Sequence, residues 1–264
     1  MDPSTSPHLH PHDISGFWPL IRLGEFSFPT YYVVISVACC ICIVWLVKRT
    51  EKRVLSRTDA IDLALALMIM GFIGARLFHV LFEEPGYYLD TPFRIVEFWN
   101  GGFVWYGGAI LGAASAMLLA KKKKIPLPTW LDLFAPVIAL GYMLGRVACL
   151  FTGCCYGEVC LVVPDHPFRH PTQAYAIATE ALTLLVLLWL EKARREGKGP
   201  SWARPAGRIF FVWLALHSAG RILMEAFRAD PRGPAPLGVS FSTWISLLLI
   251  AVSAIMIFRK GGRR

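Results

Sequence analysis

The fold is decided by one stretch of the chain, Gly145-Arg146-Val147-Ala148-Cys149-Leu150-Phe151-Thr152-Gly153-Cys154-Cys155-Tyr156-Gly157. It begins inside a long apolar segment and leaves it through a turn bounded by glycines. It contains an arginine where a membrane segment would carry hydrocarbon, and three of the seven cysteines. An ionisable residue within an apolar span is costly and is by default a functional-site candidate. Arg146 is therefore the first candidate site residue.

The composition around this stretch is that of a membrane protein. Of the 264 residues, 55% are hydrophobic and only 17% are charged, less charge than a soluble domain carries. Apolar runs of about 17–22 residues, long enough to cross a bilayer as helices, recur along the whole chain. We therefore predict an all-α polytopic fold, with residues 1–24 as a disordered extracytoplasmic tail and residues 25–264 as a single membrane domain. The net charge is +9, but the basic residues cluster between apolar runs and at the C-terminus, so the charge does not indicate a nucleic-acid partner.

Seven apolar runs are predicted to span the membrane. They are Tyr31–Val47, Ala60–Phe82, Gly102–Ala120, Trp130–Phe151, Thr172–Leu190, Gly207–Phe227 and Ser240–Phe258. The segments on one side of these spans hold 18 lysines and arginines, and those on the other side hold 5. Positive charge marks the cytoplasmic side. The sequence therefore predicts an outer N-terminus and a cytoplasmic C-terminus.

Three arginines share one predicted depth. Arg76, Arg146 and Arg221 each lie one or two turns before the outer end of an outward-running span. Each belongs to a polar stripe along one helix face, such as His217, Arg221 and Glu225. Such arginines could reach the interface or pair with carboxylates, but three at one depth favour a shared anion site. Arginine grips phosphate with two donors at once, and the phosphate available at that depth is a lipid headgroup.

Glycines and a short polar motif are predicted at the same outer face. The pairs Gly101-Gly102 and Gly107-Gly108 flank an aromatic stretch and allow close backbone approach. Gly108 with Gly112, and Gly141 with Gly145, have the spacing of close helix contacts in lipid. The motif His170-Pro171-Thr172-Gln173 opens the fifth span at this face.

Together these residues resemble a family, the bacterial prolipoprotein diacylglyceryl transferases, over roughly residues 25–258. Order, spacing and the seven-span topology all agree. The matching pieces are Gly74-Ala75-Arg76-Leu77, Gly101-Gly102 to Gly107-Gly108, Gly145-Arg146 to Gly153 and Gly157, His170-Pro171-Thr172-Gln173 with Tyr175, and Arg221 with Glu225 and Arg228.

The resemblance implies a seven-helix membrane body with a small extracytoplasmic head. It implies transfer of the diacylglyceryl group of phosphatidylglycerol to the lipobox cysteine of a prolipoprotein, with release of glycerol phosphate. The partners are then phosphatidylglycerol, prolipoprotein signal peptides and membrane lipids. No cofactor or metal is expected, and the enzyme is expected to act as a monomer in the bacterial inner membrane.

The resemblance also assigns roles to residues. Arg146 would hold the lipid phosphate, and the tyrosine early in the first span falls on Tyr31 or Tyr32. The expected catalytic residues are Tyr106, His170, Arg221 and Glu225. The expected substrate-binding residues are Arg76, Arg146, Tyr32, Gly102, Gly107, Gly153, Gly157 and Gln173.

The chain departs from the family pattern at three positions. The family often has histidine where Tyr106 stands, and asparagine and glutamate where Cys149 and Cys154 stand. The general base is therefore left open among Tyr106, His170 and His217. A disulfide from Cys154 or Cys155 to Cys149 or Cys160 would staple the turn after Arg146.

Three other functions compete with this one. A divergent family member could bind or move anionic phospholipid without transfer. A thiol oxidoreductase is suggested by Cys154-Cys155, but the chain has no CxxC motif. A serine protease is disfavoured because Ser218 lies in His-Ser-Ala-Gly, without a GxSG motif.

Overall fold

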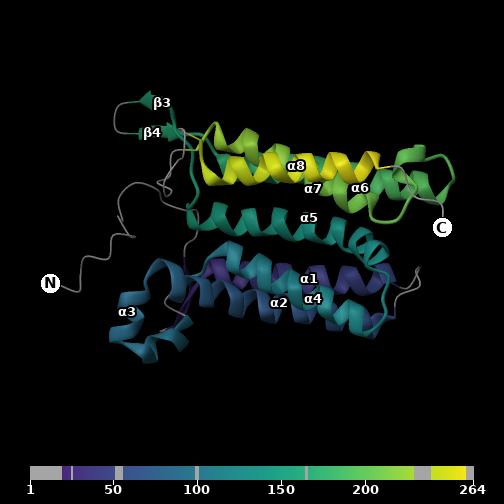
Figure 1. The fold of residues 1–264 in the computed structure, drawn as a ribbon. Helices are drawn as coiled ribbons and strands as arrows, with labels where there is room; N and C mark the ends of the chain where they lie inside the picture. The colour runs from purple at the N-terminus through teal and green to yellow at the C-terminus, as the bar shows by residue number, and fades with distance from the viewer. Residues whose placement is uncertain are drawn as a thin grey trace. The chain divides into compact units, whose positions relative to one another are not determined.

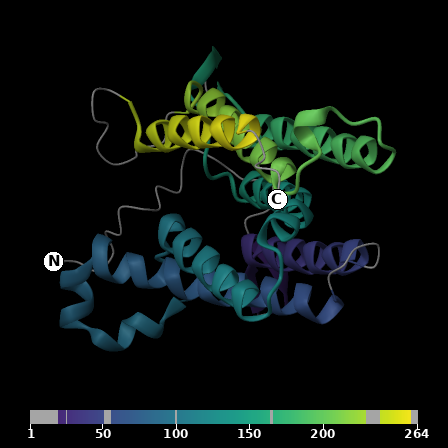
Figure 2. The ribbon, with the colours of Figure 1, turned by 45° about the vertical axis from the view of Figure 1, so that its right-hand side comes forward.

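The computed structural model describes residues 20–24, 26–50, 56–98, 101–163, 166–228 and 239–259. The chain forms two compact units. The larger consists of residues 1–42 and 134–264, and the smaller of residues 43–133. We call them the large unit and the small unit (Figures 1 and 2).

Long helices occupy every predicted span. They are α1 (Thr30–Thr50), α2 (Arg57–Phe78), α4 (Trp105–Lys122), α5 (Leu127–Thr152), α6 (Thr172–Arg195), α7 (Arg208–Glu225) and α8 (Phe241–Phe258). Their ends differ from the predicted ends by a few residues, because the polar flanks of α2, α4 and α6 continue the helical turns. The prediction of a helical chain is confirmed.

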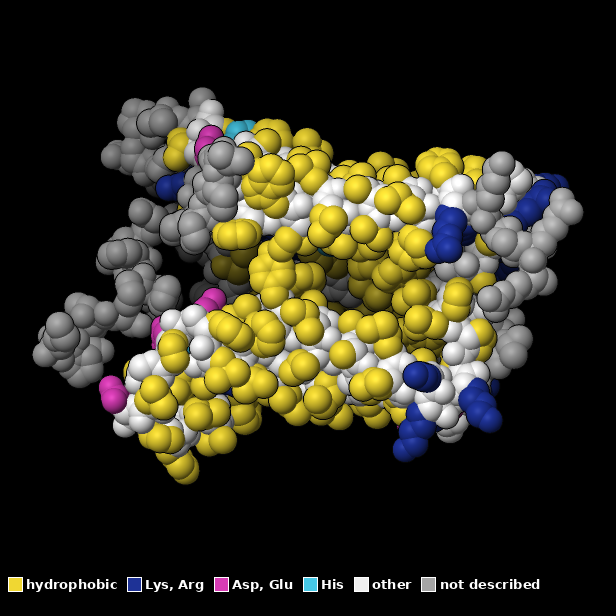
Figure 3. All heavy atoms as spheres, viewed as in Figure 1, with side chains coloured by type: hydrophobic (Ala, Val, Ile, Leu, Met, Phe, Trp, Pro, Cys, Tyr) yellow, Lys and Arg dark blue, Asp and Glu magenta, His cyan; other side chains and the backbone are white. Residues whose placement is uncertain are grey.

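Five of these helices are long and apolar enough to cross a membrane among the described residues: α1, α2 with its continuation to Glu83, α5, α6 and α8. In Figure 3 apolar side chains cover the helices, and lysines and arginines gather where helices end. Many of these apolar side chains are exposed, including Leu185, Trp189 and Phe258 at 64%, 60% and 74%. Such exposure is expected of side chains that face lipid. The chain is a polytopic membrane protein.

The small unit is built on a close crossing of α2 and α4 (Figure 1). A Cβ added at Gly74 or at Gly107 would overlap the backbone carbonyl of the other glycine. A Cβ at Gly108 or Gly112 would lie 2.9 Å from a backbone oxygen of α2. The predicted close contact through Gly108 and Gly112 is therefore confirmed. Gly107 lies in the same crossing.

A short compact segment connects α2 to α4. It comprises a π-helical turn η1 (His79–Glu83), helix α3 (Pro85–Asp90) and the 3₁₀ turn η2 (Pro92–Val96). Proline opens both α3 and η2, at the position where a missing backbone N–H costs least. The segment returns the chain to α2, where the backbone N–H of Val104 donates to the carbonyl of Ala75 at 2.9 Å.

The large unit packs α6, α7 and α8 side by side (Figures 1 and 2). Its core combines small residues of α5, Ala135 and Ala139, with Leu187 and Leu190 of α6 and Ile209 of α7. All five are at most 1% exposed. This packing holds α5, α6 and α7 together.

Two antiparallel hairpins were not predicted. One pairs β1 (Leu20–Leu23) with β2 (Phe26–Pro29), and the other pairs β3 (Val159–Val163) with β4 (His166–Arg169). Of the segment 1–24, predicted to be a disordered tail, only residues 20–24 are described, and four of them form β1. The second hairpin belongs to the connection between α5 and α6.

Candidate functional site

Arg146 lies on α5, two turns before the helix ends at Thr152. Its guanidinium stacks on the ring of Tyr142, one turn earlier, at 4.7 Å from the ring centroid. No carboxylate of the described residues pairs with Arg146. An arginine held by an aromatic face rather than by an acid keeps its positive charge available for an anion.

Arg221 lies on α7 and is held differently. Its Nη2 donates to the Ser242 hydroxyl of α8 at 2.9 Å, and the same nitrogen is 4.0 Å from the Glu225 carboxylate. The predicted neighbourhood of Arg221 and Glu225, one helical turn apart, is confirmed. The pair is about one-fifth exposed, so its charge is only partly screened by solvent.

A buried carboxylate lies between α6 and α7. Glu180 is 3% exposed and accepts a hydrogen bond from Trp213 Nε1 at 2.9 Å. Its other oxygen is 2.8 Å from His217 Nδ1. The imidazole stacks on Trp213 and meets the Tyr142 ring edge-on, with centroids 4.6 Å apart. Glu180 thus fixes one ring nitrogen of His217 and leaves the other for a ligand.

Arg221, Glu180 and His217 line one small pocket between α5, α6 and α7. Its walls include Tyr142, Glu180, His217, Gly220, Arg221 and Met224. Tyr142 connects the pocket to Arg146. The structure therefore brings Arg221, the histidine–carboxylate pair and the ring that supports Arg146 into one place.

Glu180 was missed at the level of sequence. The signal was present, because Glu180 is the only acidic residue inside the predicted span Thr172–Leu190. A lone carboxylate in an apolar span is expensive unless it is paired, which is the condition found here.

The connection after α5 is held by residues predicted to bind substrate. Gln173 is 5% exposed, and its Nε2 donates to the carbonyl of Cys154 at 2.5 Å. The Thr172 hydroxyl donates to the carbonyl of Cys155 at 2.5 Å. Gly153 has φ +71°, which favours glycine at this turn. In this structure Gln173 and Gly153 shape the loop after Arg146.

His170 and Gly157 lie together behind that loop. The backbone N–H of Gly157 donates to the His170 carbonyl at 3.1 Å. A Cβ on Gly157 would be 2.6 Å from the His170 Cβ. The His170 ring is 3.2 Å from the Tyr175 hydroxyl and packs against Phe227. The His170 ring therefore contacts Tyr175 and Phe227 within the loop.

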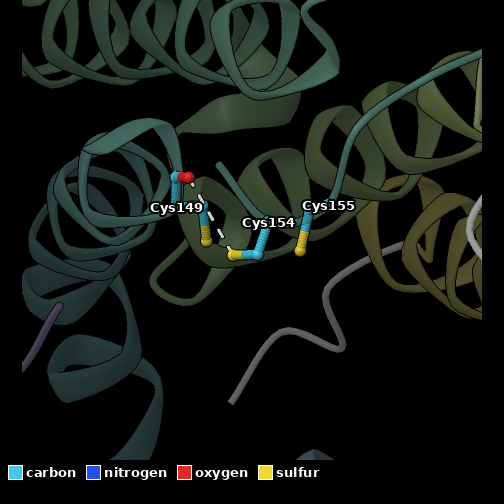
Figure 4. A group of neighbouring side chains, drawn as sticks. All are labelled: Cys149, Cys154 and Cys155. Carbon is cyan, nitrogen blue, oxygen red and sulfur yellow. Dashed lines mark hydrogen bonds between the residues drawn. The ribbon is translucent and has the colours of Figure 1, made fainter. Parts of the chain in front are cut away.

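Three thiols meet at this loop (Figure 4). The sulfurs of Cys149, Cys154 and Cys155 all lie within 4.8 Å of one another. Hydrogen bonds from the other two thiols, and then the charges of Arg228 and Arg146, hold the pKa of Cys155 below its usual value despite burial. All seven cysteines are free thiols, so the disulfide considered from the sequence is not formed.

The first-span tyrosines differ in their surroundings. Tyr32 is 44% exposed, and its ring is edge-on to Tyr31 at 5.9 Å. The Tyr31 hydroxyl lies within electrostatic range of Arg146 and of the three thiols. Between the two positions left open by the sequence, the structure brings Tyr31 to the site.

The small unit holds the remaining predicted residues: Arg76, Gly102, Tyr106 and Gly107. Arg76 is 8% exposed, and all five of its N–H donors point at backbone carbonyls. The acceptors, at 2.5 to 3.4 Å, are the carbonyls of Arg94, Ile95, Glu97, Gly101 and Gly102. In this structure Arg76 organises the segment before α4.

Gly102 and Tyr106 also lie at the entry to α4. Gly102 has φ +77°, and a Cβ there would lie 2.6 Å from a guanidinium nitrogen of Arg76. It would also lie 2.5 Å from the His79 ring, whose Nδ1 is 2.5 Å from the Glu83 carboxylate. Tyr106 is 39% exposed in the first turn of α4. Gly102 is thus the residue that lets the chain pass over Arg76.

The fold and the site define a helical membrane protein with a small pocket lined by Arg221 and by a buried histidine–carboxylate pair. A family model described as prolipoprotein diacylglyceryl transferase matches residues 19–259, and the chain belongs to this family.

Curated relatives named phosphatidylglycerol–prolipoprotein diacylglyceryl transferase agree over most of the chain. The protein of Clostridium tetani is 30% identical, covering 88% of this chain and 93% of its own length. The protein of Nitrosomonas europaea is 35% identical, covering 76% and 73%. The protein of Geobacter sulfurreducens is 29% identical, covering 97% and 98%.

Proposed function

We propose that this chain transfers the diacylglyceryl group of phosphatidylglycerol to the lipobox cysteine of prolipoproteins. The cysteine sulfur forms a bond to the glycerol carbon, while the bond from that carbon to the phosphate oxygen breaks. Glycerol phosphate leaves with the electron pair, and the thiol proton goes to a base. Membership of the family and the names of the curated relatives support this activity.

The observation that carries the proposal is Arg146 beside the pocket, with no paired carboxylate among the described residues. Negative charge grows on the phosphate as the carbon–oxygen bond breaks. A guanidinium already in position stabilises that charge without reorganisation. Arg221, on the pocket wall, supplies a second positive charge, and Glu225 and Ser242 orient it.

His217 is the base favoured by the structure among the three left open. It lines the pocket, and Glu180 holds its Nδ1, so that Nε2 is the nitrogen that accepts the thiol proton. Carboxylates orient catalytic imidazoles and stabilise the imidazolium in the same way in other enzymes. The ring of His170 is 3.2 Å from the Tyr175 hydroxyl and packs against Phe227 within its loop.

The proposed topology has seven membrane spans, with the N-terminus outside and the C-terminus in the cytoplasm of the bacterial inner membrane. It is supported by seven helices of at least 18 residues and by the 18-to-5 asymmetry of basic residues. In this proposal α4 and α7 cross as well, although their polar residues make them less apolar. Reporter fusions after Lys124 and Arg264 should both give cytoplasmic signals, and an external signal at either contradicts the topology.

The activity is tested with the full chain, as a monomer in lipid nanodiscs. The substrates are phosphatidylglycerol with a labelled headgroup and a lipobox peptide. The expected result is that labelled glycerol phosphate is released and that the peptide gains the mass of one diacylglyceryl group, in equal molar amounts. Binding of phosphatidylglycerol with neither product would instead support the alternative, a protein that binds or moves anionic lipid.

A further inference from the structure

Three cysteine sulfurs converge at the end of α5. Cys149 is buried in the last turn of the helix, and Cys154 and Cys155 follow in the loop. The three sulfurs lie within 4.8 Å of one another (Figure 4). The proposed transfer uses the thiol of its substrate, so this cluster is not needed as the nucleophile.

The loop backbone is shaped so that the thiols meet. Cys155 has φ +63°, a left-handed conformation that a residue with a Cβ seldom adopts. Gln173 and Thr172 hold the carbonyls of Cys154 and Cys155 from α6, each at 2.5 Å. Strained conformations persist where the surroundings over-determine them, and they cluster at functional sites.

The separation of the sulfurs suits coordination to one ion. With metal–sulfur bonds of about 2.3 Å, sulfurs around a common ion lie roughly 3.8–4.0 Å apart. The observed limit of 4.8 Å exceeds this by less than about 1 Å, within reach of side-chain rotation alone. Thiolates are soft ligands and select Zn²⁺ and Cu⁺ over hard cations.

The surrounding charge suits the complex that would form. Three thiolates leave a net charge of −1 around Zn²⁺ and −2 around Cu⁺. Arg146 and Arg228 both lie within electrostatic range of Cys155. Two guanidinium groups near such an anionic complex offset the charge that burial would otherwise disfavour.

We propose that Cys149, Cys154 and Cys155 form a binding site for one thiophilic ion, Zn²⁺ or Cu⁺. Binding displaces the thiol protons and changes no oxidation state. It joins the last turn of α5 to the loop that Gln173 holds, one helical turn beyond Arg146. The ion therefore restrains the support of the phosphate-binding arginine.

The test uses the full chain purified in detergent, reduced and freed of metal, and then titrated with Co²⁺, Zn²⁺ or Cu⁺ without oxygen. Co²⁺ bound by thiolates gives a charge-transfer absorption, and competition with it measures Zn²⁺ affinity. Wild type is compared with Cys149→Ser, Cys154→Ser, Cys155→Ser and the triple variant. Cys40→Ser and Cys160→Ser change exposed cysteines outside the cluster and serve as matched controls.

We expect one ion per chain in wild type and in both controls. Each single cluster variant should bind at least tenfold more weakly, and the triple variant should show no thiolate absorption. Tighter binding of Zn²⁺ or of Cu⁺ identifies the ion and supports the site in either case. Wild type that binds no stoichiometric ion, or a triple variant that binds as wild type does, overturns the proposal. A disulfide among the three cysteines in protein isolated without reductant also overturns it.

Discussion

The two units each contain an arginine and a histidine–carboxylate pair, and they use them differently. In the small unit, every donor of Arg76 meets a backbone carbonyl, and Gly102 closes over His79. In the large unit, Arg146 stacks on Tyr142, and His217 faces a pocket. An arginine whose donors all meet backbone carbonyls, as in Arg76, stabilises the fold. An arginine that stacks on an aromatic ring, as Arg146 does, can bind a ligand.

The largest effect is expected at Arg146. Arg146→Ala removes the charge that we propose stabilises the leaving phosphate, so turnover should fall about 10²–10³-fold. Arg146→Lys keeps the charge but loses the two-donor fork, and it should recover only part of that loss. The measurement is release of labelled glycerol phosphate at saturating lipid, with exposed Arg195→Ala as control. Near wild-type turnover in Arg146→Ala would contradict the assignment of a functional role to Arg146 and a structural role to Arg76.

The histidine–carboxylate pairs give the next comparison. His217→Ala should lower kcat about 10²-fold, as expected for loss of a general base. Glu180→Gln should lower it less, and the double variant should resemble His217→Ala because the two act as a unit. Glu196→Gln, at an exposed carboxylate, is the control.

His79→Ala changes the histidine of the small unit's histidine–carboxylate pair and is compared with His217→Ala. It should reduce stability and leave kcat of the folded fraction near wild type. Equal kcat losses in His79→Ala and His217→Ala would contradict the assignment of the base.

Arg76→Lys should affect stability instead of chemistry. Lysine offers three donors without the planar fork, so several of the five carbonyls lose their partner. The expected loss is about 2–3 kcal/mol of unfolding free energy. It would be measured by thermal unfolding in detergent, with proteolysis between α3 and α4 as a local readout. A variant that unfolds normally but no longer binds phosphatidylglycerol would show that Arg76 is a ligand residue.

Arg221 has both a side-chain partner and a place on the pocket wall, so it is intermediate between Arg76 and Arg146. The smallest effect is expected from its coupling with Glu225. The two are 4.0 Å apart, so single and double substitutions to Ala should be non-additive in kcat/KM by about 1 kcal/mol. Ser242→Ala should reproduce part of the loss, because it removes the other partner of Arg221. Strict additivity of Arg221→Ala and Glu225→Ala would mean that the two residues serve separate purposes.

The sequence predicts the helices well because hydrophobic length is a local property. It also predicts that Arg221 and Glu225 are neighbours, since they are one turn apart on α7. It could not distinguish Arg76 from Arg146, because helix spacing gives the face of a residue and not its partners. The carbonyls that occupy Arg76 come from 18 to 26 residues further along the chain.

The hairpins were missed for a related reason, and the cysteines after Arg146 were considered as disulfide partners, whereas they form a cluster of free thiols. Strands of four or five residues carry too little pattern to be separated from loops. The meeting of Cys149 with Cys155 depends on left-handed backbone at Gly153 and Cys155, which composition does not reveal. The Glu180–His217 pair joins two helices, so only the isolated acid in its span could have indicated it.

The crossing of Gly74 and Gly107 limits how this protein can evolve. In most helix contacts, a larger residue on one side can be accommodated by a smaller one opposite. Here the residue opposite is already glycine, and the obstacle is its backbone carbonyl. No single compensating substitution exists on the facing helix, so a change at either position can be relieved only by moving α2 away from α4. That movement would displace the N–H of Val104 from its carbonyl on α2, and with it the loop that the Arg76 side chain holds.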